Sequence, residues 1–554
     1  HGAPAEGGEH GEPAEGGEHG EPAEHHVTET TLTASILLFG FLIFDIVLLY
    51  LVNWADPNVR SYMYKMISTT VSIFSAVLLN QAIRSIVLEQ ILCSPFPRGF
   101  NITITPTIEI LVGLAQFVTC FTGVNVACWY FRKSLVLHAV EVIGGHLTAF
   151  SGVAFFGHIQ EVCEESKVHV AVVFLAAIVF MVLCRALSYN IRKACFDDNS
   201  RYATVLHESI NAHESNDAHE SHNAHAESHW LEAVVEAEDD AAGIILSFLM
   251  AQALAYYIAD FLPPLEGPGS RMPASHWKII HLFDASLLFL AGLMMATWAH
   301  QRWMKKQNKG HENHEKHQHR TRFFKSVQHF LAMSMSWCLL LSAIWSVSLL
   351  NLFKNAHMTF VLAAFIVTAL SVLCVIALDV LADLLDSFEG HESRKTELVA
   401  SPEGDDDANQ FGPSSAALDN MEQVVRMIIG AFGLLVGLSW EKAFDMCHEA
   451  IIEGTPILEH HKVISKTFMA FSIAAIVIPA WLKYLVPMAK KQVEHHEAVM
   501  NLEKEQMKNP KAHAGLDVME KNVVLMFNSL EPDQRAKVFK KLTDKQAAGL
   551  SNTM

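Results

Sequence analysis

Long apolar runs alternate with short polar stretches along most of the chain. Eleven runs predict helices that cross a membrane, at about 32–53, 66–92, 107–131, 135–159, 168–190, 241–263, 278–300, 325–353, 358–385, 421–446 and 464–487. The hydrocarbon core of a bilayer is about 30 Å thick, so a helix needs roughly 20 apolar residues to cross it. The pattern therefore predicts an all-α fold, a polytopic helical membrane protein with about 11 transmembrane helices.

The tenth run indicates that the helices form a repeating set. The stretch Lys65–Ala82 aligns without a gap to Arg426–Ala443, and the run that begins at Ile244 aligns in the same way. On this interpretation the even-numbered runs are copies of one helix, and each is followed by a partner helix. The chain would then be one leading helix plus five helical hairpins. The alternative is chance, because apolar helices resemble one another by composition alone.

Small residues recur in these runs at spacings that favour close helix packing. Gly433 and Gly437 lie four apart in the tenth run, and Gly145 and Gly152 lie seven apart in the fourth. Both spacings place the two glycines of a pair on one helix face, where a neighbouring backbone can approach closely. We expect tight helix contacts there, and the glycines carry no functional information.

Composition agrees with a membrane protein. Hydrophobic residues make up 51% of the chain and charged residues 18%, whereas a soluble domain carries about 25% charged residues. The net charge of −19 therefore belongs to the loops and tails, and no basic domain stands out, so we expect no nucleic-acid partner. The first residue is His1, which is consistent with a removed signal peptide or a trimmed chain, and we favour the signal peptide.

Basic residues predict the orientation. The first, third, fifth, seventh and eleventh runs are followed by lysine or arginine, at Arg60 and Lys65, Arg132 and Lys133, Arg192 and Lys193, Arg302, Lys305 and Lys306, and Lys490 and Lys491. Because cytosolic loops carry an excess of these residues, the N-terminus is expected outside or in a lumen and the C-terminus in the cytosol. The expected location is a plasma or secretory-pathway membrane.

Features of the predicted outer loops agree with this orientation. The sequon at Asn101 lies in an outer loop, where glycosylation takes place. Cys93, Cys163 and Cys447 lie at or near the outer side, where a disulfide is permitted. Three cysteines allow three pairings, of which we prefer a disulfide between Cys93 and Cys163.

Polar stretches divide the chain into segments. The expected boundaries are 1–30 (His/Glu/Gly-rich arm, outside), 31–193 (transmembrane helices 1–5), 194–239 (His-rich cytosolic linker), 240–307 (helices 6–7), 308–322 (His-rich cytosolic loop), 323–386 (helices 8–9), 387–418 (acidic cytosolic linker), 419–488 (helices 10–11) and 489–554 (cytosolic helical tail). The arm repeats a nine-residue unit rich in Gly, Pro and Glu, which cannot bury enough apolar surface to fold alone. It is a solvated tail or a metal-collecting or pH-sensing arm.

Histidines concentrate in two of the cytosolic segments. The candidate metal ligands are His207, His213, His219, His222, His225, His229, His311, His314, His317 and His319. Such loops occur in zinc and nickel transporters, where neutral imidazoles collect a borderline metal. A divalent metal such as zinc is therefore the candidate cofactor. The alternatives are a pH-responsive linker, because histidine titrates near neutrality, and a linker without a ligand.

The C-terminal tail carries one weak resemblance. It reads VVLMFNSLEPDQRAKVFKKLTDKQAAGLSNTM, in which a Leu-x-Pro turn precedes an amphipathic helix and a second, Ala-rich helix. This pattern resembles one unit of the helical repeats in flagellar motor switch proteins and magnesium-transporter cytosolic domains, over about 30 residues. The resemblance implies a small cytosolic helical hairpin that docks on a partner.

Ionisable residues inside the runs are the candidates for a transport path. Each costs about 2.5–3.5 kcal/mol at mid-depth on insertion scales and needs a reason. The candidates are Asp45, Arg84, His138, Glu141, His146, Arg185 and Asp284. The fourth run is the richest, since His138 lies one turn before Glu141 on a polar stripe. The alternative is interhelical ion pairs, such as Asp45 with Arg84 or Glu141 with Arg185.

Catalytic motifs are missing from the sequence, so we expect no enzyme. It contains no Walker motif, GxSxG or HExxH. The leading hypothesis is a channel or transporter for a small cation, either a proton or a divalent metal. The alternative is a structural scaffold or a subunit of a larger membrane assembly. The expected partners are the lipid bilayer and a homo-oligomer or larger assembly, joined through the N-terminal arm and the C-terminal tail.

Overall fold

The fold is given by a computed structural model, which describes residues 29–54, 56–93, 100, 102–132, 134, 136–195, 222–263, 275–307, 314–350, 356–399 and 414–488. Within these ranges every regular element is a helix, which confirms the predicted all-α class. The helices are α1 (Glu29–Val52), α2 (Pro57–Ser85), the π-helix η1 (Ile86–Leu92), α3 (Pro106–Phe131), α4 (Leu137–Val162), α5 (Lys167–Cys195), α7 (His222–Ala259), α8 (His276–Gln307), α9 (His314–Leu349), α10 (Ala356–Val399), α11 (Ser414–Glu453), α12 (Pro456–Glu459), α13 (Lys462–Ala480) and the π-helix η2 (Trp481–Leu485).

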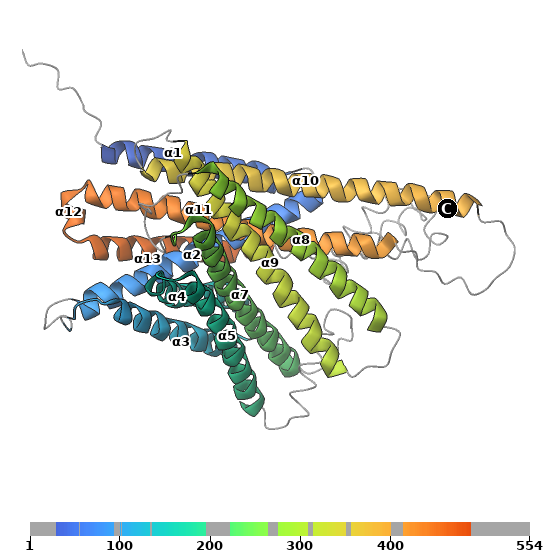
Figure 1. Cartoon of the computed structure of the whole chain (residues 1–554), viewed down its shortest axis with the longest axis horizontal. Coiled ribbons are helices and arrows are strands. Elements are labelled where there is room, and N and C mark those ends of the chain that lie inside the picture. The colour runs from blue at the N-terminus through green and yellow to red at the C-terminus, as the bar shows by residue number, and fades with distance from the viewer. Residues whose placement is uncertain are drawn as a thin grey trace, which may run out of the picture.

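Eleven stretches of the described chain are long and apolar enough to cross a membrane. They lie on α1, α2, α3, α4, α5, α7, α8, α9, α10, α11 and α13, in the order that the eleven apolar runs predict. Successive helices turn back on one another, as α8, α9 and α10 show in Figure 1. The ends of the described helices therefore lie at two ends of the bundle. We call the end where α5 and α8 finish and α9 begins the basic end.

Five helices form an inner ring. Helix α2 packs on α4, α4 on α7, α7 on α9, α9 on α11, and α11 on α2 again. Between 56% and 83% of the most apolar stretch of each of these helices is buried, against 11% to 44% for the other six. The inner helices are the five even-numbered apolar runs. All five run in the same direction, because an outer helix returns the chain between them.

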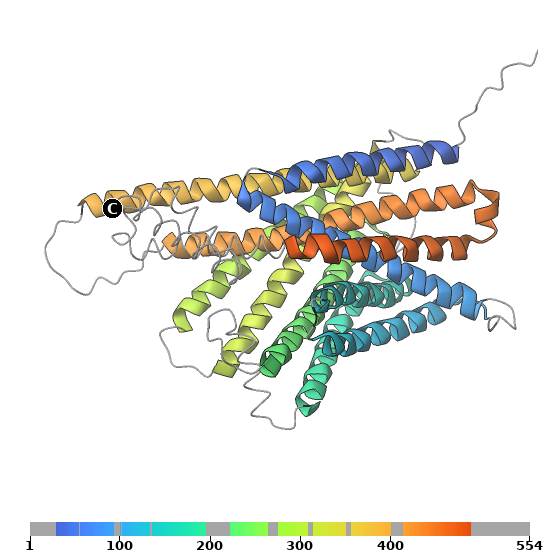
Figure 2. The same cartoon turned by 180° about the vertical axis from the view of Figure 1, so that it is seen from behind.

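The helices of the bundle are not parallel. In Figure 1, α1, α10, α11 and α13 lie along one direction, while α5, α7, α8 and α9 run obliquely from it toward the lower right. Figure 2 shows from behind that α2 crosses between the two groups. The helices therefore lie closer together at one end and spread apart toward the basic end.

The predicted hairpins pair the helices wrongly. The closely packed neighbours in sequence are α3 with α4, α8 with α9 and α10 with α11, so an inner helix packs on the outer helix that precedes it. Helix α2 instead takes α13, the last helix, as its main outer neighbour. The apolar pattern identifies the helices but contains no information on which neighbour shares the shorter and tighter connection.

Glycines let the inner helices approach closely, as their spacing predicts. A Cβ atom at Gly433 would lie 2.7 Å from Cβ of Thr69, and one at Gly437 would lie 3.2 Å from the Thr70 carbonyl oxygen. At Gly145 the nearest atom would be Cα of Ala237 on α7, at 3.2 Å. These distances leave no space for a side chain, so the α2–α11 and α4–α7 contacts are backbone against backbone.

Helix boundaries differ from the predicted segment boundaries. Helix α7 begins at His222, so most of 222–239 continues the transmembrane helix although it was expected in the linker 194–239. Helix α10 extends to Val399, and α11 begins at Ser414, inside the expected linker 387–418. Six acidic residues of α7 lower the local hydropathy, which is why the apolar pattern placed the beginning of this helix too late.

An acidic residue joins three helix ends opposite the basic end. Asp260 follows α7 with a φ of 66°, in the left-handed region that favours Gly, Asn and Asp. Its carboxylate accepts hydrogen bonds from Lys167 of α5 at 2.6 Å and Lys278 of α8 at 3.1 Å. The two ammonium groups hold the pKa of Asp260 below its ordinary value of 3.8. These contacts fix the ends of α5, α7 and α8 relative to one another.

Candidate functional site

The first turns of α7 carry an acidic segment between two sets of neighbours. Glu232, Glu236 and Asp240 are four residues apart and share one face of the helix, whereas Glu238 and Asp239 point to another. One face meets α4 and α9 of the inner ring, and the other meets α5 and the start of α9. The same helix therefore builds two different clusters of charged groups.

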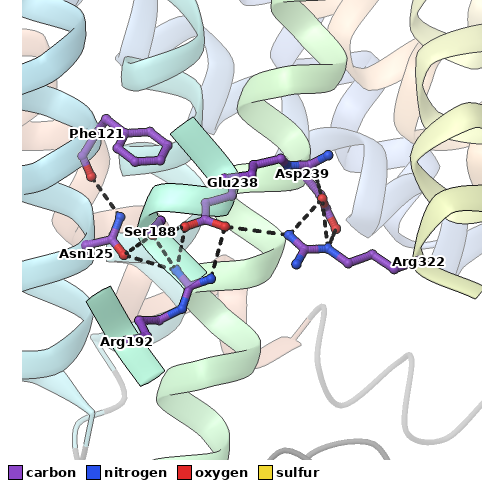
Figure 3. Close-up of polar contacts among 8 residues, drawn as sticks. Phe121, Asn125, Ser188, Arg192, Glu238, Asp239 and Arg322 are labelled. Carbon is purple, nitrogen blue, oxygen red and sulfur yellow. Dashed lines mark hydrogen bonds and ion pairs between the residues drawn. The ribbon is translucent and has the colours of Figure 1, made fainter. Parts of the chain in front are cut away.

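The first group, the arginine cluster, consists of Arg185, Arg192, Arg322, Glu238 and Asp239. Arg192 of α5 donates two hydrogen bonds to Glu238, at 2.5 and 3.3 Å, and the two side chains are only 4% and 2% exposed (Figure 3). A buried ion pair is tolerated only where further hydrogen bonds satisfy the charges. Two polar neighbours supply them here.

Ser188 and Asn125 complete the Arg192–Glu238 pair. The Ser188 hydroxyl lies 2.5 Å from the Glu238 carboxylate and 2.7 Å from an Arg192 nitrogen. Arg192 also donates to the Asn125 side-chain oxygen at 3.4 Å, and the Asn125 amide donates to the Phe121 carbonyl at 2.9 Å (Figure 3). The network joins α3, α5 and α7 through charges that the lipid-like interior would otherwise exclude.

Asp239 is held by two further arginines. Arg322 of α9 donates three hydrogen bonds to its carboxylate at 3.2–3.3 Å (Figure 3). Arg185 of α5 also forms an ion pair with this carboxylate. Arg322 also lies 3.6 Å from the Glu238 carboxylate. Three guanidinium groups thus surround two carboxylates. The cluster is charge-compensated, which is the arrangement expected of a structural network.

The second group, the inner cluster, consists of Glu141, His146, Glu236, Asp240 and His329. Glu141 of α4 and Glu236 of α7 lie on two helices whose backbones meet at Gly145 and Ala237. Asp240 lies 3.5 Å from Nδ1 of His329 on α9. In the described part of the chain, no arginine forms an ion pair with any of the three acids. The inner cluster is therefore acidic and is not compensated as the arginine cluster is.

Part of the inner cluster is accessible although it lies on inner helices. The side chains of Asp240 and His329 keep 26% and 27% of their surface accessible, whereas Glu141 keeps 10%. Lys65 of α2 is close enough to act electrostatically on both Asp240 and His329. Groups from α2, α4, α7 and α9 thus converge on one region near the basic end of the ring.

An apolar core separates this region from polar groups toward the other end. The core joins the inner helices through residues such as Ile73, Ile245 and Leu434. On its far side the Gln81 amide donates to the Glu441 carboxylate at 2.9 Å, although Glu441 is 1% exposed. The inner ring therefore has polar groups near both ends and many buried apolar residues between them.

A further group of polar side chains on α2 and α4 includes Arg84, one of the candidate residues for a transport path. Arg84 contacts His158, and Nδ1 of His158 lies 2.7 Å from Glu161. Asn80 accepts a hydrogen bond from Gln116 at 2.8 Å and another from Ser151 at 2.8 Å. These contacts satisfy the polar side chains between α2, α3 and α4.

The structure places the candidate residues for a transport path in different environments. Glu141 and His146 belong to the inner cluster, Arg185 to the arginine cluster, and His138 lies 3.6 Å from Glu141 with 54% of its side chain exposed. Asp284 is 58% exposed on α8, 3.9 Å from His281, and lies apart from both clusters. The Asp45 side chain lies outside the described residues. The suggested Glu141–Arg185 pair is wrong, because Arg185 takes Asp239 instead.

Other predicted sites are contradicted or lie outside the described residues. Cys93 and Cys163 are free, so the predicted disulfide is wrong. The Cys93 sulfur contacts the Ile102 carbonyl at 3.3 Å, and Cys163 ends α4. Asn101 lies outside the described residues.

The histidine-rich segments are mostly beyond the described part. His207, His213, His219 and His311 lie outside it, as do the side chains of His222, His225, His314, His317 and His319. His229 is described and exposed. No group of three possible metal ligands occurs among the described residues. Metal capture by these segments therefore stays a prediction.

Sequence reasoning missed most of both clusters. Glu236, Glu238, Asp239 and Asp240 were assigned to a linker or its edge, and His329 was passed over although it lies inside an apolar run. The available signal was the four-residue spacing of acids directly before an apolar run. Chemically, the inner cluster can attract cations and bind or release protons.

No family model, curated protein or solved structure matches this chain.

Proposed function

We propose that the chain is a multi-pass membrane protein that moves a small cation, either a proton or a divalent metal, through its inner ring of helices. The observation that carries this proposal is the inner cluster, in which three acids and two histidines from α4, α7 and α9 meet without an arginine partner. On the positive-inside argument, the basic end faces the cytosol.

The free-energy cost of placing ionisable residues inside a membrane supports a functional role for the inner cluster. An ionisable residue inside a membrane span costs about 2.5–3.5 kcal/mol on insertion scales, so it marks a pathway or a structural pair. Glu238 and Asp239 have a structural explanation, since three arginines compensate them. Glu141, Glu236 and Asp240 have none of this kind. Acids without arginine partners in a region of partial accessibility raise the local concentration of cations.

The arrangement along the ring supports a gated path. The inner cluster lies on the basic side of the apolar core, and Glu441 with Gln81 lies on the other side. A cation bound at the inner cluster must pass the apolar layer to reach the far side. We therefore propose that transport requires a rearrangement of the inner helices.

Flux through reconstituted liposomes tests the proposal. The purified full chain is placed in vesicles that contain a pH-sensitive or a metal-sensitive dye, and a proton or zinc gradient is applied with valinomycin to balance charge. Wild type should pass one of these cations, and Glu236→Gln and Asp240→Asn should lose the flux. Glu453→Gln is the matched control, because Glu453 is 60% exposed and pairs with Lys462. Absence of flux for every cation would refute transport.

The arginine cluster favours a second candidate function, a structural membrane scaffold. Buried acids paired with arginines and a closed apolar core are what a scaffold would contain. A scaffold does not need the uncompensated inner cluster, so Glu236→Gln would then leave every measured property unchanged except stability. Zinc capture by the histidine-rich segments, and assembly through the arm and the tail, stay predictions.

A further inference from the structure

Two arginines at the basic end of the α8–α9 pair lie over tryptophan rings. The guanidinium carbon of Arg302 is 5.1 Å from the centroid of the Trp298 ring, and that of Arg320 is 5.9 Å from the centroid of the Trp303 ring. A guanidinium within about 6 Å of a ring centroid is attracted by the negative face of the ring. Both arginine side chains are exposed. The two cations are therefore held on aromatic surfaces while they stay accessible from outside.

Further rings fix the aromatic surface under Arg320. Phe324 of α9 stacks on Trp303 with the centroids 5.9 Å apart, and on His300 with the centroids 5.0 Å apart. His300 is only 6% exposed, so this stack is anchored in the contact between α8 and α9. The contact of Arg320 with Trp303 also joins the start of α9 to the end of α8. The ring under this arginine is therefore part of the folded helix pair.

Both arginines lie at the limits of apolar stretches that are long enough to cross a membrane. The stretch of α8 ends at Trp303, and that of α9 begins at Arg320. Deeper on α8, Met294 and Met295 are 51% and 66% exposed, as suits side chains in contact with acyl chains. Tryptophan is enriched at the level of the lipid headgroups, and arginine near a helix end extends its charge to that level. The two guanidinium groups therefore lie at the depth of lipid phosphates.

Acids of the chain do not neutralise the positive charge of this surface. The described residues 296–303 and 320–350 include no aspartate or glutamate. Neither Arg302 nor Arg320 forms an ion pair with a described residue, whereas Arg322 pairs with the carboxylates of the arginine cluster. The surface therefore offers two cations to an anion from outside the chain.

Lysines at the opposite end of the bundle are arranged differently. Lys278, near the start of α8, pairs with Asp260 at 3.1 Å, and Lys462, at the start of α13, pairs with Glu449 at 2.7 Å. The two ends of α8 thus differ in kind. Its first turn uses a carboxylate of the chain to neutralise a cation, and its last turns place their cation on an aromatic ring.

We propose that the surface formed by Trp298, Arg302, Trp303 and Arg320, the arginine–tryptophan surface, binds the phosphate groups of anionic phospholipids. A guanidinium that lies on a ring keeps the N–H groups of its edge available, and arginine donates such groups in pairs to phosphate oxygens. A zwitterionic headgroup carries its own cation beside the phosphate and gains less from the two arginines. This inference goes beyond the proposed transport function and does not depend on it.

Native mass spectrometry of the purified full chain tests the preference for anionic lipid. The protein in detergent is mixed with equal amounts of phosphatidylglycerol, which is anionic, and phosphatidylcholine, which is zwitterionic, and the bound molecules of each are counted. Wild type should retain phosphatidylglycerol in excess. Each basic residue near an anionic lipid surface contributes about fivefold to affinity, so Arg302→Gln with Arg320→Gln should lower the ratio of bound phosphatidylglycerol to bound phosphatidylcholine by about tenfold or more.

The double variant Lys462→Gln with Lys466→Gln is the matched control. It removes the same charge at the opposite end, where acids of the chain pair with both lysines, so it should keep the wild-type ratio. The elution volume and the tryptophan fluorescence show that each variant is folded. Equal retention of the two lipids by wild type would overturn the proposal whether or not the variants fold. An unchanged ratio in the folded arginine variant, or an equal fall in the control, would also overturn it.

Discussion

Replacing Arg192 by methionine tests whether the arginine cluster stabilises the fold. The Arg192 and Glu238 side chains are 4% and 2% exposed, so the change would leave a carboxylate buried without its main partner. Removing one partner of such a pair costs about 3–5 kcal/mol. Glu238 would keep its hydrogen bond from Ser188 at 2.5 Å and would have Arg322 at 3.6 Å. We therefore expect a loss near the lower end, about 3 kcal/mol.

Unfolding in mixed micelles measures this loss. The protein, which has 10 tryptophans, is titrated with a denaturing detergent, and its fluorescence gives the free energy of unfolding. The double variant Arg192→Met with Glu238→Leu removes both charges and should recover at least half of the loss. Lys462→Met is the control, because its pair with Glu449 is 41% and 25% exposed and contributes at most about 1 kcal/mol. Equal losses for Arg192→Met and Lys462→Met would refute the reasoning.

Three further predictions concern packing, pH and the cysteines. Gly145→Ala should lower the free energy of unfolding by about 1–3 kcal/mol, because the added methyl group overpacks against α7. Gly123→Ala, whose added methyl group would meet no atom within 4 Å, should raise the free energy of unfolding by up to about 1 kcal/mol. Equal effects of the two variants would contradict the backbone contact between α4 and α7. The stability that Asp260 contributes should be present above pH 3.8 and lost as the pH falls through its lowered pKa. The melting temperatures of wild type and Asp260→Asn should therefore differ at neutral pH and converge in acid. If the plots of melting temperature against pH stay parallel down to low pH for the two proteins, Asp260 makes no such contribution. Cys93 and Cys163 should each react with a maleimide without prior reduction. Labelling that occurs only after reduction would show that the two cysteines form the predicted disulfide after all.

The apolar pattern predicted the helices. Membrane-spanning helices can be recognised from the length and hydropathy of an apolar run. In the structure, the helices of the even-numbered runs are the more buried ones. Gly433 and Gly145 were recognised as close-packing positions, because small residues at regular spacing have one common cause in helix bundles. The order of pairing could not be predicted, since many apolar faces are interchangeable in composition and only the completed bundle decides between them.

The candidate site was predicted only in part, for a physical reason. Glu141 and His146 stand out because they interrupt an apolar run, but Glu236 and Asp240 sit in a stretch whose charge hides its place in the helix. That stretch can enter the bundle because arginines of α5 and α9 compensate Glu238 and Asp239. Compensation by distant helices is a property of the folded state, so hydropathy averaged along the chain cannot detect it.

The initial rate of cation uptake into liposomes is the most direct measurement of the central claim. Vesicles that contain wild type, Glu236→Gln or Glu453→Gln are compared at equal protein content under the same proton gradient. The inner cluster as the cation path predicts rapid uptake for wild type and Glu453→Gln, and uptake at the rate of empty vesicles for Glu236→Gln. Equal uptake by Glu236→Gln and wild type would contradict it.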